Sequence, residues 1–137
     1  MFKGFALFLA VTVFGFCFYS LYAAKSPAFK AYSYEYELYL SSGSFGDNIA
    51  RATSTTFGLY KNVKGESCKV HVPYRQILED FSATHLFSES TEYGTSYYAY
   101  TPKLGYKVYL KGVAVNLHYF EGKEQNKLGT PMIYGSF

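Results

Sequence analysis

The chain opens with a run of residues that carries no charge, from Phe5 to Ala24, with Lys3 before it and Lys25 after it. A helix of about 20 apolar residues is long enough to cross the hydrocarbon core of a membrane. We therefore expect residues 5–24 to form one continuous apolar helix that contacts the membrane. The rest of the chain is then expected outside the cytoplasm, either anchored to the membrane or secreted.

Two kinds of segment fit this run, a cleaved signal peptide and an uncleaved signal anchor. A signal peptide has a basic start, an apolar stretch, and small residues one and three positions before the cut. Cutting after Ala24 would place Tyr22 three positions before the cut, whereas cutting after Ala28 places Ser26 there. Because the apolar run suits either segment, both alternatives stay open.

We assign residues 1–28 to this signal peptide or signal anchor and residues 29–137 to a single domain of ordinary size. Cys68 is the only cysteine after the apolar run, so no disulfide forms within the domain. After the run the chain has 12 basic residues, which are the total of 13 less Lys3, against 10 acidic ones. These charges are scattered and do not form the basic face typical of nucleic-acid-binding proteins, so we expect no nucleic acid as a partner.

The domain is rich in tyrosine, and aromatic and β-branched residues recur at every second position. This alternation predicts strands with one buried and one wet face. In residues 32–40, Glu35 and Glu37 fall on the wet face. Turns are expected at residues 62–66, through Gly65, and at Lys111 and Gly112, where a tight turn joins two strands. The predicted strands are residues 32–40, 52–60, 68–72, 85–90, 95–100, 106–110, 113–120 and a last strand that begins at Pro131.

One helix is predicted after Pro73, because an apolar stripe recurs at helical spacing at Tyr74, Ile77, Leu78 and Phe81. Proline suits the first position of a helix, where its missing N–H is no loss. The later strands have short connections, which predicts an antiparallel meander. The expected fold class is therefore α+β, an antiparallel sheet with one main helix packed on one face.

Three segments near the C-terminus carry a family resemblance: the tyrosine-rich residues 97–104, the pattern G-x-x-x-N-L at 112–117, and the pattern G-T-P-x-I at 129–133. They resemble the C-terminal part of YwmB-like exported bacterial proteins. The resemblance implies a fold similar to the sheet-and-helix unit of TATA-box-binding proteins, without implying DNA binding, because a fold does not carry a function. It implies no catalytic residues.

Candidate catalytic groups are few. Cys68 together with His71, His85 or His118 contains the side chains of a thiol nucleophile and its base. Cys68 and His71 project to opposite faces of the predicted strand, so a buried, inert cysteine is the favoured interpretation. The three histidines are too far apart in sequence to suggest a metal site, and we expect no cofactor.

Candidate binding residues lie on the aromatic strands. Tyr98 and Tyr100 share a strand face and Tyr109 is expected near them. These tyrosines either form an aromatic platform for a sugar, a peptide or a protein, or, as the favoured interpretation, cover the core or the helix with their hydroxyls at the rim. The amide of Asn116 would either bind a ligand or make a structural hydrogen bond to the adjacent hairpin. The leading hypothesis is a non-catalytic bacterial envelope domain that binds a protein or the cell wall. The alternative is a small extracytoplasmic enzyme that uses Cys68 and a histidine.

The apolar run makes a direct prediction about location. On fractionation of cells that express the full chain, the protein should remain with the membranes unless it has been cut near Ala28. Full-length chain, with residues 1–24 retained, in the soluble cytoplasmic fraction would contradict the predicted location.

Overall fold

The structure is a computed structural model that describes residues 27–40, 49–60 and 62–134. The expected apolar helix at residues 5–24 lies outside these ranges. Within them, no helix has the length and apolar character needed to span a membrane.

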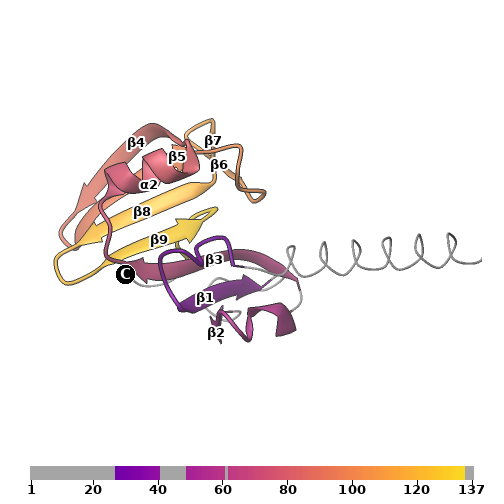
Figure 1. Ribbon diagram of the computed structural model, residues 1–137. Helices are drawn as coiled ribbons and strands as arrows, with labels where there is room; N and C mark the ends of the chain where they lie inside the picture. The colour runs from indigo at the N-terminus through magenta and orange to yellow at the C-terminus, as the bar shows by residue number, and fades with distance from the viewer. Residues whose placement is uncertain (1–26, 41–48, 61, 135–137) are drawn as a thin grey trace, which may run out of the picture.

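The described residues form a β-rich domain with one α-helix (Figure 1). The elements are β1 (Glu35–Leu40), β2 (Ile49–Thr53), the 3-10 helix η1 (Phe57–Leu59), β3 (Val63–Val70), α2 (Tyr74–Phe81), β4 (Thr84–Thr91), β5 (Gly94–Tyr100), β6 (Val108–Leu110), β7 (Val113–Val115), β8 (Leu117–Gly122) and β9 (Asn126–Thr130).

Seven strands form one sheet in the order β2-β1-β3-β9-β8-β5-β4, with every neighbouring pair antiparallel. Strands β6 and β7 form a separate two-stranded hairpin. Helix α2 lies against the half of the sheet that contains β5 and β8 (Figure 1). The α+β class predicted from the sequence is confirmed, while the likeness to TATA-box-binding proteins stays a prediction.

Successive side chains of a strand point to opposite faces, so the sheet has a helix face and an opposite face. The hydrophobic core lies on the helix face, between the sheet, Ile77 of α2 and Phe29 of the segment before β1. Buried core side chains contributed by the sheet strands are Tyr36, Leu38, Ala52, Cys68, Val70, Ala99, Leu117, Tyr119 and Leu128.

Helix α2 follows the predicted pattern. Ile77 is fully buried, and Tyr74, Leu78 and Phe81 are partly buried against the core. The helix ends at Phe81, and the next residue, Ser82, has a φ of 50°, in the left-handed region that closes many helices. Burial of one stripe, rather than intrinsic propensity, therefore stabilises this two-turn helix.

The predicted second strand, residues 52–60, is wrong beyond Thr53. The Thr53 N–H donates to Thr56 Oγ1 over 2.8 Å, and the Thr56 N–H donates back to Thr53 Oγ1 over 3.3 Å. These side-chain bonds make a turn, after which Phe57 begins η1 and packs its ring 6.3 Å from the ring of Tyr36. Threonine's β-propensity is overridden because its hydroxyl bonds to nearby backbone.

The predicted turn at 62–66 is also wrong, because Gly65 lies inside β3. A Cβ on Gly65 would lie 2.4 Å from the carbonyl oxygen of Thr130 and 2.8 Å from Cδ of Pro131. The glycine therefore allows close backbone approach and does not make a turn. The last strand ends at Thr130 and does not begin at Pro131.

The meander is interrupted. Strand β5 pairs with β8, and the hairpin β6–β7 lies between them in sequence, so the predicted strand 113–120 is broken at Asn116. The predicted tight turn of that hairpin is confirmed, since Lys111 and Gly112 both have positive φ, 51° and 78°.

Helix α2 provides a test of the core. Replacing Ile77 with Ala removes a fully buried side chain and should lower the free energy of unfolding by about 2–5 kcal/mol. Glu79→Ala, on the exposed side of the same helix, should lower it by less than about 0.5 kcal/mol. Urea unfolding of both variants measures the difference, and equal losses would show that the stripe is not buried.

Candidate functional site

Tyr98 does not form an exposed platform. It lies on the opposite face of β5, with its ring stacked between Phe87, at a centroid distance of 4.7 Å, and His118, at 4.4 Å. Its exposed fraction is 7%. The predicted exposed row of Tyr98 and Tyr100 is therefore not formed, because Tyr98 is enclosed by its neighbours.

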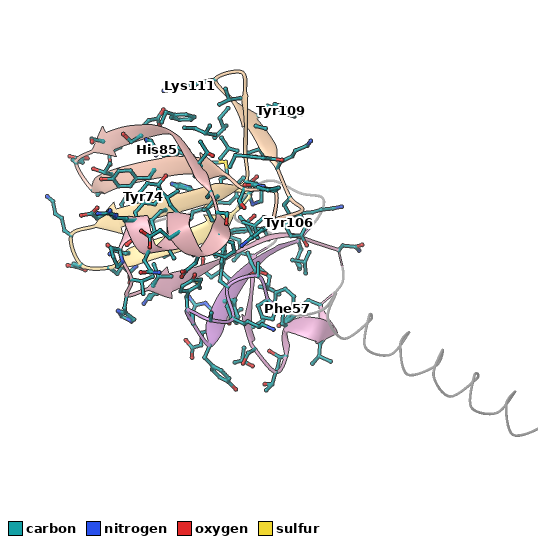
Figure 2. All side chains as sticks on the ribbon, turned by 45° about the horizontal axis from the view of Figure 1, so that its top comes forward. Phe57, Tyr74, His85, Tyr106, Tyr109 and Lys111 are labelled. Atoms are coloured by element: carbon teal, nitrogen blue, oxygen red, sulfur yellow. The ribbon has the colours of Figure 1, made fainter. Side chains whose placement is uncertain are left out.

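Tyr100 and Tyr109 remain accessible, with exposed fractions of 37% and 69%. Tyr109 lies on the hairpin β6–β7, where Lys107 Nζ approaches its ring to 5.9 Å from the centroid (Figure 2). Among the described residues, no ring contact joins Tyr100 to Tyr98 or Tyr109. Tyr100 and Tyr109 stay predicted contact residues, but as separate ones.

Asn116, the residue between β7 and β8, is hydrogen-bonded to the connection between β5 and β6. Its Oδ1 accepts from the Thr101 N–H over 2.8 Å, and its Nδ2 donates to the carbonyl oxygens of Thr101, at 2.6 Å, and Leu104, at 3.1 Å. Only 1% of the residue is exposed. The amide is thus engaged in structural hydrogen bonds, one of the two roles considered from the sequence, and has no surface to offer a ligand.

The G-T-P-x-I segment also has a structural role. The chain folds back after β9, so the Ile133 N–H donates to Nδ1 of His118 over 3.0 Å. A Cβ on Gly129 would lie 2.7 Å from Cγ1 of Ile133, so only glycine leaves room for this return. Because Nδ1 accepts, the other ring nitrogen of His118 carries the proton and donates to Ser96 Oγ, 2.9 Å away.

The thiol and the histidines do not converge. Burial raises the pKa of Cys68 to about 12, with a further contribution from Glu66, so the nucleophilic thiolate is not populated at neutral pH. His71 is exposed at the end of β3, and His85 pairs through Nδ1 with the Tyr74 hydroxyl at 2.8 Å (Figure 2). In the ranges that the structure covers, no three His, Cys, Asp or Glu residues gather in a way that would hold a metal ion.

A groove of about 420 Å³ crosses β2, β1, β3 and β9. By strand alternation, its charged residues lie on the opposite face of the sheet, away from α2. Residues with polar side chains that line it are Ser33, Glu35, Glu37, Arg51, Thr53, Thr56, Ser67, Lys69 and Lys127.

Basic residues outnumber acidic ones in the lining of this groove. Lys69 of β3 and Lys127 of β9 are directly opposite each other. Lys127 Nζ lies 3.9 Å from Oε2 of Glu37, which itself is directly opposite Arg51. Like charges directly opposite are destabilising on a sheet, so an anionic group placed between the two lysines would be stabilised.

Sequence reasoning missed this groove because strand partners that far apart in sequence cannot be paired without the topology. The alternation identified Glu35 and Glu37 as the wet face of their strand, but nothing local joins Lys69 to Lys127. It also missed Glu66, which shares the core face of β3 with Cys68 and Val70. These three residues recur at every second position, which is the signal for a shared strand face. The wrongly predicted turn at 62–66 placed Glu66 outside the predicted strand and so hid this signal.

Comparison of the chain with protein-family models, with curated proteins and with solved structures found no match.

The buried imidazole of His118 predicts a dependence of stability on pH. Burial lowers the pKa of His118 from its ordinary 6.5 to about 4, so the unfolded chain binds more protons between these values. As the pH falls from 7 to 4, the free energy of unfolding of the natural chain should decrease by about 3 kcal/mol relative to that of His118→Gln. Urea unfolding of both proteins across this range measures the difference. Parallel curves would mean that the ring is not buried in its neutral form.

Proposed function

We propose that this chain is a non-catalytic bacterial envelope domain, held at the outer face of the membrane or released from it, that binds a protein or a cell-wall polymer. The uncharged run at residues 5–24 and the resemblance to YwmB-like exported proteins support this location. The geometry of the domain supports a binding role.

The observation that carries the binding role is the pair Lys69 and Lys127, directly opposed inside the groove. The groove is large enough to take in part of a partner, and two lysines at facing strand positions favour a carboxylate or a phosphate there. Glu37 beside Lys127 would favour a cationic group next to that anion. We therefore propose that the partner presents an anionic group flanked by polar or basic ones.

The enzyme hypothesis receives less support from the same geometry. None of the residues that line the groove is a histidine, and Cys68, which borders it, belongs to the hydrophobic core with its thiol protonated. A nucleophile needs an adjacent base or a lowered pKa, and burial acts on Cys68 in the opposite direction.

Reversal of one charge tests the groove. Lys69→Glu should abolish most capture of partners from a bacterial envelope fraction, because it places a carboxylate where the anionic group binds. Lys64→Glu, an exposed position on the same strand that does not line the groove, is the matched control and should leave capture unchanged. Both surface changes should alter the free energy of unfolding by no more than about 0.5 kcal/mol.

The bound fraction is read by quantitative pull-down at low and high salt. Capture through an exposed ion contact should weaken as the salt concentration rises, because ions screen such contacts. Equal capture by Lys69→Glu and Lys64→Glu would exclude the groove. Loss of capture in Tyr109→Ser alone would point to the exposed hairpin tyrosine instead.

A further inference from the structure

Glu66 is a carboxylate buried in the middle of the sheet. It lies on β3 between the buried residues Gly65 and Ser67, its exposed fraction is 1%, and it faces the core side of the strand with Cys68. None of the ion pairs formed by the described residues involves it. Burying an ionised carboxylate without a cation is strongly unfavourable, so this position requires a partner.

The donor that reaches the carboxylate is the backbone of the segment before β1. The Phe29 nitrogen lies 3.1 Å from Oε1 of Glu66, and the Ala28 N–H also donates to the carboxylate. Phe29 is fully buried, and its ring packs edge-to-face at 5.7 Å from the ring of Phe81 on α2. The Phe29 nitrogen is therefore fixed in place against the carboxylate.

Within the part of the chain that the structure describes, no charge is found that would balance Glu66. The ionisable groups that feel its charge are Tyr36, Cys68 and Tyr106, all of which are neutral at pH 7 and have raised pKa values. Thr130 is directly opposite Glu66 on β9, and its buried Oγ1 has no hydrogen-bond partner among the described residues. Among the described residues, the carboxylate therefore has the amide N–H groups of Ala28 and Phe29 as donors and no cation beside it.

The sequence places a cleavage motif at the same nitrogen. Ser26 and Ala28 are the small residues that a signal peptidase requires three positions and one position before its cut. The bond that such a protease would hydrolyse is the one between Ala28 and Phe29. Cleavage there would make the Phe29 nitrogen the new N-terminus of the chain.

We propose that a signal peptidase cuts the Ala28–Phe29 bond, and that the resulting α-ammonium group of Phe29 forms a buried ion pair with Glu66. Water supplies the hydroxyl of the new Ala28 carboxyl group and a hydrogen to the Phe29 amine, which takes up a further proton. The hydrogen bond from Ala28 is lost with the leader, and the ammonium group replaces it with a charge-assisted one.

The order of events follows from burial. Phe29 is fully buried and Pro27 is buried, and although Ala28 between them is exposed, a protease cannot draw both sides of this bond into its site while the domain is folded. The cut therefore precedes folding, and the free ammonium group then contributes to the stability of the folded domain. In the uncut chain, burial raises the pKa of Glu66 to about 7, which shows how poorly amide donors alone compensate the charge.

The first test is the identity of the exported protein. The full 137-residue chain is expressed with its own leader in an exporting bacterium, and the intact mass and N-terminal sequence of the product are measured. We expect a product that begins at Phe29. Ala28→Leu, which removes the small residue before the cut, should abolish this product, whereas the exposed control Ala31→Leu should leave it unchanged.

The second test measures the ion pair. Pulse proteolysis in urea gives the unfolding equilibrium constant of free and membrane-held chains alike. Glu66→Gln should raise this constant roughly 100-fold in the cut protein, where it leaves the ammonium group unpaired, and by less than about tenfold in the uncut Ala28→Leu protein. If the cut Glu66→Gln protein does not fold, chemical labelling of the native protein replaces this comparison. The Phe29 amine should then react far more slowly in the folded chain than after unfolding.

Several outcomes would overturn the proposal. A product that begins at another residue excludes the cut. An uncut chain held in the membrane also excludes the cut, but it agrees with the proposed location. Equal effects of Glu66→Gln in cut and uncut proteins, or a freely reactive Phe29 amine in the folded chain, exclude the ion pair. None of these results bears on the groove, which lies on the other face of the sheet.

Discussion

The buried carboxylate of Glu66 is the constraint on which the N-terminal half of the domain depends. It lies on a central strand of the sheet and must accept hydrogen bonds, so residues 27–33 have to cross the core face of the sheet near it. That path places Phe29 and Tyr32 against Phe81, at 5.7 and 6.1 Å between ring centroids. The position of α2 over the core therefore depends on the hydrogen bonds that the Glu66 carboxylate accepts.

The C-terminal half is fixed by hydrogen bonds that replace regular strand pairing. Asn116 ties the β5–β6 connection to the start of β8, and the hydroxyl of Thr101 in that connection donates to the last helical carbonyl, that of Phe81. His118 likewise fixes the C-terminal segment after β9, because its Nδ1 accepts a hydrogen bond from the Ile133 N–H. The patterns G-x-x-x-N-L and G-T-P-x-I thus serve folding, and the polar groove on the opposite face is the surface that we propose for a partner.

The sequence was sufficient for features that depend on local periodicity and insufficient for those that depend on pairing. Helix α2 and the turn at Lys111 were predicted correctly, because an apolar stripe and a glycine turn are local signals. The turn assigned to Gly65 and the strand assigned from Pro131 were wrong, because the contact between these residues forms only when β3 and β9 pair. For the same reason, the opposed Lys69 and Lys127 had no signature in either strand alone.

The proposed ion pair would link export to folding, since only a chain cut before it folds would carry an ammonium group beside Glu66. The most direct measurement is a ¹³C NMR titration of the Glu66 carboxyl in the exported protein. The account predicts that the carboxyl stays ionised down through the ordinary titration range of glutamate, because the ammonium group lowers its pKa. A carboxyl that titrates near pH 7, as burial without a cation dictates, would contradict it.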